Sequence, residues 1–463
     1  MGEEFDVVVI GAGVVGCAVA RDFSRFDLTT ALLEAASDLG EGASKGNTAW
    51  LCSGWDTAAG TIERACVVRG YERYRKEAPE LGLPNWSCGH MVTARTPDQA
   101  ERLAADVDAA RKDGFETVRL LDAAEAYERL PALGPGLEAA IWAPDDGIID
   151  PFSVPVAYAL DAVANGVAYR ADCPVTAVRR ADDLWHLTVP NGTVAARLVI
   201  NCAGLYGDAL DRLAGFDDFV IRPRRGQYIL FDKSAAPLCD MIVSTAPSSM
   251  GRGIGVQPTI FGNVLLGPTA EEVDDPEDRR TTPEGLAALL AGAQIQIPEL
   301  LDHPVTTSWA GMRPASEDPD YRIIPRPSDR WISVGGIRST GLSGALGIAE
   351  QVVNSAIPSV LDAPFTETVV PVRVPSLAEQ NARPWADDQN IAADPAHGEI
   401  LCHCERITLG EVMAVLDSPL PPVGLKALKR RTRVMMGRCQ GFFCGARVRG
   451  LLGQAQSQAG VRP

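Results

Sequence analysis

Apolar positions at the start of the chain form a short continuous run and then a helical pattern. Phe5–Ile10 is apolar and β-branched, which is typical of a parallel strand buried on both faces. A glycine turn and a helix follow in EFDVVVIGAGVVGCAVARDF, and a second apolar run, LTTALLEAA, predicts a strand that ends at Glu34. The pattern therefore predicts a β–α–β unit at the start of the chain.

Two later segments repeat the pattern of a strand followed by a glycine turn. Residues 199–210 (VINCAGLYGDAL) predict a strand and a turn, and residues 331–353 (WISVGGIRSTGLSGALGIAEQVV) predict a strand, a turn and a helix. Between them, residues 220–232 (VIRPRRGQYILFD) and 263–270 (NVLLGPTA) suggest strands of a separate mixed or antiparallel sheet.

Composition and charge narrow the classes of function. A chain of 463 residues is expected to form two or three domains. Its net charge of −17 argues against a nucleic-acid or anionic-membrane partner. The sequence has no run of about 18 apolar residues that would predict a spanning helix, and its acidic start lacks the basic region of a signal peptide. Eleven cysteines in such a chain suggest reduced thiols in the cytoplasm, as ligands or core residues rather than disulfides.

The glycines after the first strand predict a dinucleotide site. Gly11, Gly13 and Gly16 give the spacing in which the first allows the turn, the second lets a pyrophosphate approach the backbone, and the third lets helix and strand pack closely. Glu34 can accept hydrogen bonds from ribose hydroxyls. The alternative is a glycine turn that binds nothing. The N-terminal unit and the two later strand-and-turn segments, residues 199–210 and 331–353, would converge on one extended cofactor. This arrangement favours FAD over NAD.

These motifs, taken together and in order, resemble the D-amino-acid-oxidase-type superfamily of FAD oxidoreductases. The resemblance is greatest to its anaerobic glycerol-3-phosphate dehydrogenase and 2-hydroxyglutarate dehydrogenase branch. It implies an α/β and α+β protein with a Rossmann-like FAD domain interrupted by a substrate domain. The motifs that carry it, besides the N-terminal glycine turn, are GASKGNTAWLCSGWD, GTIERACVVRG, APDDGIIDPFSV, VINCAGLYGD, RPRRGQYILFDK, VQPTIFGNVLLGPTAEEVDD, WAGMRPASEDPDYRII and GGIRSTGLSGALGIAE.

The resemblance also implies which residues contact the FAD. Residues matching Ser44 and Asn47 lie near the pyrophosphate and flavin in similar proteins, and Val175 would contact the adenine side. The full set of cofactor residues expected on this basis is Gly11, Gly13, Gly16, Glu34, Ser44, Asn47, Val175, Ala203, Gly204, Gly336, Gly341, Leu342 and Ser343.

Four residues are candidates for contact with the substrate. Arg313, in AGMRP, matches an arginine that holds a substrate carboxylate or phosphate, and a guanidinium offers a bidentate fork for either group; the alternative is a structural salt bridge. Arg338 faces the substrate or braces the flavin turn, and Tyr228 is a substrate contact or a packed strand aromatic. Cys52 stands where the branch usually carries a histidine, the natural base for oxidising an alcohol. This change argues against glycerol 3-phosphate and favours an amino acid or other amine. The alternatives are a different base, a reactive Cys52, a loss of activity, or Cys52 as a small buried side chain.

Four cysteines gather in the last part of the chain, after a linker rich in Pro, Asp and Ala. Cys402, Cys404, Cys439 and Cys444 have the spacing C-x-C, 34 residues, C-x4-C. Zinc more often has C-x2-C pairs, and free thiols are a third alternative. The pattern is similar to bacterioferritin-associated ferredoxins, which implies a 2Fe–2S cluster. A basic run lies nearby: Lys426, Lys429, Arg430, Arg431, Arg433 and Arg438. Charge compensation for the cluster is the first interpretation, a solvated helix face the second, and a docking patch for an acidic redox partner the third.

The sequence therefore predicts a soluble FAD- and 2Fe–2S-dependent dehydrogenase for a small anionic substrate: glycerol 3-phosphate, a 2-hydroxy acid or an amino acid. Alternatives are an electron-transfer subunit without turnover and a regulatory protein with a zinc tail. A redox partner or second flavoprotein subunit is expected, so the cytoplasmic protein could be peripheral to a membrane through that partner. The predicted domains are 1–85, 140–215 and 320–362 for FAD, 86–139 and 216–319 for substrate, 363–397 as linker and 398–463 for the 2Fe–2S cluster.

Overall fold

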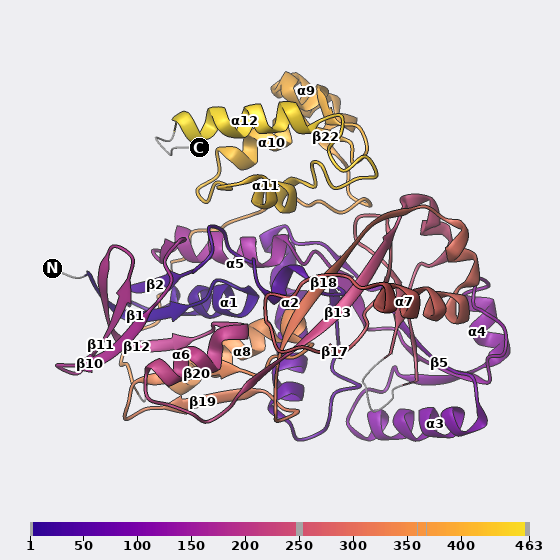
Figure 1. Cartoon of the computed structure of the whole chain (residues 1–463), viewed down its shortest axis with the longest axis horizontal. Helices are drawn as coiled ribbons and strands as arrows, with labels where there is room; N and C mark the ends of the chain where they lie inside the picture. The colour runs from indigo at the N-terminus through magenta and orange to yellow at the C-terminus, as the bar shows by residue number, and fades with distance from the viewer. Residues whose placement is uncertain (1–2, 247–252, 359, 367, 459–463) are drawn as a thin grey trace.

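The computed structural model describes residues 3–246, 253–358, 360–366 and 368–458. Two large sheets with their helices make up most of the molecule, and a small, mainly helical unit at the end of the chain lies against them (Figure 1). The α/β class predicted from the sequence is confirmed. Among the described residues, no helix is both long enough and apolar enough to cross a lipid bilayer.

The first sheet has eight strands and a parallel centre. Strand β1 (Glu3–Ile10) pairs in parallel with β2 (Thr30–Leu33) and with β12 (Gly192–Asn201), and β12 pairs in parallel with β20 (Trp331–Gly335). The strands predicted at the three glycine turns are thus neighbours. The remaining strands are β9 (Ala168–Arg170), beside β2, and β10 (Ala177–Ala181), β11 (Leu184–Val189) and β19 (Arg322–Arg326), which pair antiparallel at the edges.

Alternate side chains of β1 fill two cores, one on each face of this sheet, as expected for a buried parallel strand. Val7 and Val9 face a helical layer, whereas Val8 and Ile10 face the opposite core, which includes β11 and α6 (Gly207–Leu213). The helical layer consists of α1 (Val14–Phe23), α2 (Ile62–Leu81), α5 (Ser153–Ala164) and α8 (Gly341–Ala356).

The second sheet has nine strands and is mixed, as predicted. Its longest pairing joins β13 (Ile221–Phe231) antiparallel to β18 (Val305–Ser316). Its other strands are β5 (His90–Ala94), β6 (Arg119–Asp122), β7 (Ala139–Ala143), β14 (Ile242–Thr245), β15 (Gly255–Pro258), β16 (Val264–Gly267) and β17 (Glu271–Glu272), with β5 and β14 parallel. Helices α4 (Ala123–Arg129) and α7 (Pro283–Gln296) cover one face, and α3 (Pro97–Lys112) packs against strands on the other. Strands β3 (Trp50–Leu51), β4 (Asn85–Trp86) and β8 (Gly147–Ile149) form a small third sheet.

The C-terminal unit (residues 400–458) has a hydrophobic core of its own. It follows α9 (Asp388–Ala393) and contains β21 (Ile400–Cys402), β22 (Ile407–Thr408), α10 (Leu409–Leu416), α11 (Leu425–Thr432) and α12 (Gly445–Gln458). Thr408 and Glu411 form a capping box that starts α10. Figure 1 shows α11 as the helix of this unit that lies nearest to the first sheet and its helices.

Candidate functional site

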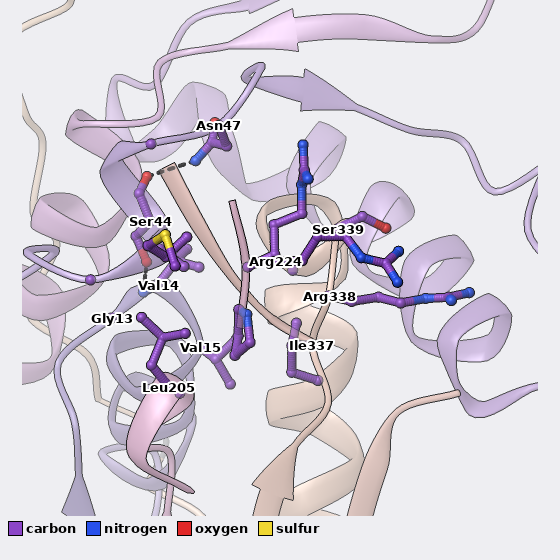
Figure 2. A pocket seen from close by; sticks show the side chains of 18 of the residues that line it. Gly13, Val14, Val15, Ser44, Asn47, Leu205, Arg224, Ile337, Arg338 and Ser339 are labelled. Carbon is purple, nitrogen blue, oxygen red and sulfur yellow. Dashed lines mark hydrogen bonds between the residues drawn. The ribbon is translucent and has the colours of Figure 1, made fainter. Parts of the chain in front are cut away.

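A cavity of about 1520 Å³ lies between the two large sheets. It is lined by the glycine turn after β1, by the loop around the short helix η1 (Ala43–Lys45), and by strands β13 and β18. Pockets for single small molecules are usually about 300–1,000 Å³, so this cavity has room for a dinucleotide and a substrate. Figure 2 shows Gly13, Val14 and Ser44 on one side of it, and Arg224 and Arg338 on the other.

The glycine turn has no room for side chains at two positions. Gly11 has φ +101°, and a Cβ there would lie 2.5 Å from the carbonyl oxygen of Cys202. A Cβ at Gly16 would lie 1.8 Å from the carbonyl oxygen of Gly11, so Gly16 allows α1 to pack against the turn. Gly11 and Gly13 line the cavity and Gly16 does not. Gly13 caps α1 with extended backbone and no side-chain hydrogen bond, which leaves the start of the helix open to an anionic ligand.

Glu34 follows β2 and lines the same end of the cavity. Its Oε2 accepts a hydrogen bond from the backbone N–H of Ala12 (2.7 Å), and its Oε1 accepts one from Ala36 (2.9 Å). Burial raises the pKa of this carboxyl above its ordinary value, although these backbone N–H groups oppose the shift. Because each oxygen can accept a further hydrogen bond, the carboxylate could hold ribose hydroxyls.

Ser44 and Asn47 fix the loop that crosses the start of α1 (Figure 2). The Ser44 hydroxyl accepts a hydrogen bond from the Val14 N–H at 2.9 Å, and the Asn47 side chain donates to the Ser44 carbonyl at 2.7 Å. Both residues line the cavity. The predicted residues Val175, Ala203, Gly204, Gly341 and Leu342 line it as well.

Two further predicted cofactor residues lie outside the cavity lining. The Ser343 hydroxyl accepts a hydrogen bond from the Cys52 N–H (2.9 Å) and donates to the Trp50 carbonyl (3.0 Å), so it holds this segment in place. Gly336 has φ +67°, and a Cβ there would lie 2.8 Å from Ser316 Oγ. Both residues thus lie behind the cavity wall, and their contact with the cofactor stays a prediction.

The loop and the second sheet meet at two glycines. A Cβ on Gly311, in β18, would lie 1.9 Å from the carbonyl oxygen of Gly46, and a Cβ on Gly46 would lie 2.8 Å from the Cα of Gly311. This backbone approach sets β18 directly against the loop that contains Ser44 and Asn47. It therefore brings Arg313, two residues further along β18, to the cavity.

Arg313 and Arg224 are cross-strand partners on β18 and β13, and both line the cavity. Arg224 forms an ion pair with Glu272 at 3.0 Å. Arg313 donates to the Thr269 carbonyl at 3.3 Å and is hydrogen-bonded to Tyr228, but it has no ion pair within the described part of the chain. Tyr228 is buried, stacks on Trp309 with 5.4 Å between ring centroids, and lines the cavity. Burial raises its pKa, and the Arg313 guanidinium opposes that shift.

A buried carboxylate that the sequence reasoning did not single out, Glu63, lines the cavity near the start of α2. Its Oε1 accepts the Thr340 hydroxyl at 2.5 Å, and its Oε2 lies 3.8 Å from Arg338 Nη2. Arg338 therefore braces this corner as well as lining the cavity. Tyr321 lies beside this corner, since its hydroxyl is hydrogen-bonded to that of Thr340 (2.6 Å); burial raises the pKa of Tyr321, and the Glu63 carboxylate raises it further. The helix start in GTIERACVVRG is the only sequence signal that marked Glu63.

Cys52 is buried at the cavity wall, one of several residues of the NTAWLCSGWD segment that line the cavity. No histidine lines the cavity in the described residues. His90 lies one layer behind, with its ring centroid 4.9 Å from that of Trp50. Its Nδ1 lies 3.3 Å from Asp146 Oδ2, and its Nε2 lies 2.8 Å from Ser244 Oγ. The candidate bases at the cavity wall are thus carboxylates rather than a histidine.

The four C-terminal cysteines lie close together in the C-terminal unit and form no disulfide. The thiols of Cys404 and Cys439 are hydrogen-bonded to each other, as are those of Cys402 and Cys444. Within the described ranges, no three His, Cys, Asp or Glu side chains are grouped so that they could hold a metal ion. The four thiols thus form two contacting pairs, and the cluster that the sequence suggested stays a prediction.

Part of the basic run contacts the rest of the molecule and is therefore not a solvated face, whereas charge compensation for a cluster stays a prediction. Arg430 is buried and contacts Asp38 (2.8 Å) and Glu41 (2.6 Å), and buried Arg431 also pairs with Asp38. Burial raises the pKa of Asp38, and the two guanidinium groups oppose the shift. Arg433 lies over the ring of Phe261 (3.9 Å), and Arg438 Nε contacts Asp232 Oδ2 (3.1 Å). Lys426, at the start of α11, is exposed.

Comparison with known proteins agrees with this geometry. A sequence model of the FAD dependent oxidoreductase family matches residues 6–355. The glycerol 3-phosphate dehydrogenase of Caloramator mitchellensis is 33% identical over 450 residues, which cover 96% of this chain and 93% of that protein. A subunit of the anaerobic glycerol-3-phosphate dehydrogenase of Escherichia coli is 26% identical over 490 residues, with 96% of this chain and 88% of that protein covered.

A solved structure also matches. Dithionite-reduced L-alpha-glycerophosphate oxidase from Mycoplasma pneumoniae with FAD bound superposes with a TM-score of 0.76 and 25% identity, covering 81% of this chain and 99% of that one. The oxidase is thus matched almost completely while about a fifth of the present chain is left over. The two dehydrogenases match along 96% of the chain, so their matched regions include most of the C-terminal unit.

Proposed function

Because this chain belongs to the FAD dependent oxidoreductase family, we propose that it is a dehydrogenase that oxidises the CH–OH group of a small anionic substrate. Glycerol 3-phosphate is the first candidate and a 2-hydroxy acid the second. The relative from Caloramator mitchellensis supports glycerol 3-phosphate, since it is 33% identical over nearly the whole chain. An amino acid, which needs no dedicated base, is the third candidate.

One observation carries the choice of an anionic substrate: the cavity contains a partly buried guanidinium, Arg313, without an ion pair in the described residues. A charge taken out of water costs free energy unless an opposite charge accompanies it. The second arginine, Arg224, lies directly across the strand pair and adds to the positive potential. A phosphate or carboxylate bound here would supply the missing partner in a bidentate contact.

The residues around the cavity fit FAD. Gly11, Gly13 and the open start of α1 would hold its pyrophosphate, and Glu34 its ribose. Bound FAD would supply the two-electron oxidation by accepting a hydride from the carbinol carbon. The hydroxyl proton needs an acceptor in the protein, and we assign it to Glu63. Among the carboxylates of the described residues that line the cavity, only Glu63 is buried.

The proposal includes a 2Fe–2S cluster held by Cys402, Cys404, Cys439 and Cys444. The spacing of these cysteines, C-x-C and C-x4-C, departs from the C-x2-C pairs that zinc more often has, which supports the cluster over a zinc ion. Such a cluster would supply one-electron transfer. The two dehydrogenase relatives match most of the C-terminal unit, whereas the oxidase lacks a counterpart for about a fifth of the chain. This difference supports electron delivery to a protein partner rather than to oxygen, and the Escherichia coli relative is itself one subunit of its enzyme.

The test of the substrate class is Arg313→Ala, assayed anaerobically with an artificial electron acceptor and glycerol 3-phosphate, 2-hydroxy acids or amino acids. Hydrogen bonds to a charged group contribute about 1.5–3 kcal/mol, so kcat/KM should fall roughly 10- to 100-fold, mainly through KM. Arg222→Ala is the matched control, because Arg222 is an exposed arginine of the same strand as Arg224 and lies outside the cavity lining.

Equal kcat/KM values in both variants would refute the role of Arg313. Absence of turnover with every substrate, in protein that contains flavin, would instead favour the alternative function, an electron-transfer subunit.

A further inference from the structure

The loop between Cys439 and Cys444 exposes two aromatic side chains. Phe442 is 84% exposed and Phe443 is 76% exposed, and no other large apolar side chain among the described residues exceeds 64%. Their ring centroids are 5.2 Å apart, with an interplanar angle of 88°. Large exposed aromatics are disfavoured on a surface that meets only water, and they are the residue type enriched at protein interfaces.

The backbone of this loop is held in the conformation that presents the two rings. The Phe442 N–H donates to the Cys439 carbonyl at 2.9 Å, and the Gly445 N–H donates to the Gly441 carbonyl at 2.8 Å. Gly441 has φ +87°, and a Cβ there would lie 2.7 Å from Met435 Cε. The rings therefore stand on an ordered loop rather than on a loose end, and both lie between two of the four cysteines.

The sequence around the loop is rich in basic residues, although the whole chain has a net charge of −17 and several of these residues pair with carboxylates. After Asp417 the sequence contains no carboxylate side chain. Two arginines of the first turns of α12, Arg447 and Arg449, are exposed, although Arg447 also contacts Glu399, and the Arg438 side chain is 67% exposed. The cationic residues after Asp417 are Lys426, Lys429, Arg430, Arg431, Arg433, Arg438, Arg447, Arg449 and Arg462.

We propose that Phe442 and Phe443, with the flanking Arg447 and Arg449, form the docking surface for an acidic electron-carrier protein. This inference rests on the proposed 2Fe–2S cluster, because its ligands Cys439 and Cys444 border the aromatic pair. Aromatic anchors at the centre and charges at the rim are the usual anatomy of a protein interface. Opposite charge would steer the carrier to this surface and make binding depend on salt.

A protein partner accounts for these features better than an anionic membrane does. Peripheral membrane binding usually needs an amphipathic helix or a lipid anchor in addition to a basic patch, whereas this apolar element is two residues on a short loop. The strong negative charge of the rest of the molecule would also oppose approach to anionic lipids.

The experiment measures binding of the full-length holoprotein to a fluorescently labelled flavodoxin, an acidic one-electron carrier, at 50 and 300 mM salt. Wild-type protein should bind, and more weakly at the higher salt concentration. Phe442→Ser/Phe443→Ser and Arg447→Glu/Arg449→Glu should each weaken binding at least about tenfold. Controls are Val305→Ser, which changes an exposed valine of β18, and Arg102→Glu/Arg111→Glu, which changes net charge equally on the distant helix α3.

Absence of flavodoxin binding by the wild type would overturn the proposal, as would equal affinities in the loop variants and the controls. Vesicles of phosphatidylcholine and phosphatidylserine and analytical ultracentrifugation complete the test. Vesicle binding or self-association that depends on the two phenylalanines, without flavodoxin binding, would overturn it in favour of a membrane or a second copy. Iron and sulfide assays on the same samples test the cluster separately. Flavodoxin binding that depends on the two phenylalanines, in protein without iron, would support the docking surface and refute the proposed cluster.

Discussion

A single carboxylate decides how the proposed reaction disposes of its proton. Glu63 is buried, lines the same cavity as Cys52, and is held by the Thr340 hydroxyl at 2.5 Å. Its other oxygen has only a contact of 3.8 Å to Arg338. An oxygen held in place in this way can accept a hydroxyl proton as the hydride leaves the neighbouring carbon.

Replacing Glu63 by Gln should therefore slow the reductive half-reaction without loss of the cofactor. General base catalysis contributes about 10²- to 10⁴-fold, so the rate of flavin bleaching by glycerol 3-phosphate in an anaerobic stopped-flow instrument should fall by at least about 10². Glu63→Asp, which keeps the carboxylate, should recover part of the rate. If Glu63→Gln binds FAD normally and bleaches at the wild-type rate, Glu63 is not the base.

At the residue scale, sequence reasoning could find groups whose chemistry is written into a motif. Arg313, Tyr228 and Cys52 all line the cavity, as the resemblance implied. Glu63 was not found, because it lies on the first turn of an ordinary amphipathic helix and acquires its position only when α2 packs near the turn before α8. The resemblance assigned Ser343 to the flavin; its hydroxyl contacts the backbone of Trp50 and Cys52, and its contact with the cofactor stays a prediction.

At the scale of elements, the crossing of β18 over the cofactor loop joins the two halves of the site. The backbones of Gly46 and Gly311 approach so closely that a methyl group at Gly311 would lie 1.9 Å from a carbonyl oxygen. Backbone atoms on both sides cannot rotate away as a flexible side chain can. The position of Arg313 relative to the loop that holds Ser44 and Asn47 therefore depends on the absence of two side chains.

Gly311→Ala should push β18 away from the loop and loosen the cofactor. Overpacking of this kind costs about 1–3 kcal/mol, so we expect a lower unfolding temperature and a weaker affinity for FAD, measured by thermal melting and by fluorescence titration of apoprotein. Gly450→Ala is the control, since no atom lies within 4 Å of its added Cβ and the residue lies in helix α12. A Gly311→Ala protein with unchanged FAD affinity would show that the crossing does not shape the site.

The elements themselves were predictable where local pattern and burial agree. The run Phe5–Ile10 forms β1, and the glycine turn leads directly into α1. The three strands before glycine turns are neighbours in one sheet because their apolar residues must be covered on both faces. The Gly46–Gly311 contact could not be predicted, because it joins residues far apart in the chain and a glycine's function there depends on its neighbour.

At the scale of the whole molecule, ion pairs hold the C-terminal unit against the rest of the protein. Asp38 is buried and contacts both Arg430 and Arg431, and Arg430 also reaches Glu41 at the edge of the cavity. The sequence showed only a basic run, and an amphipathic helix with such a run is most often solvated. Its acidic partners lie almost 400 residues earlier, so no local pattern could indicate the contact.

Arg430→Ala/Arg431→Ala should destabilise the protein by leaving Asp38 buried without its charged partners. Removing one side of a buried ion pair costs about 3–5 kcal/mol. The free energy of unfolding of the variant, measured by urea unfolding at pH 8, should be lower than that of the wild type by about this amount. Loss of both arginines would raise the already elevated pKa of Asp38 further, so the folded state would bind a proton that the unfolded state releases. The difference in unfolding free energy between the wild type and this variant should therefore shrink as the pH falls from 8 toward 5.5. Lys426→Ala, on the exposed side of α11, is the control, and equal stability of the two variants would contradict this account.

The most direct test of the whole account is the anaerobic visible spectrum of the purified protein, with iron and acid-labile sulfide assayed, before and after glycerol 3-phosphate is added. The account predicts flavin absorption, about two iron and two sulfide per chain, and bleaching of the flavin by the substrate. Flavin that stays oxidised with glycerol 3-phosphate and with every 2-hydroxy acid, in protein that contains both cofactors, would contradict the proposed dehydrogenase.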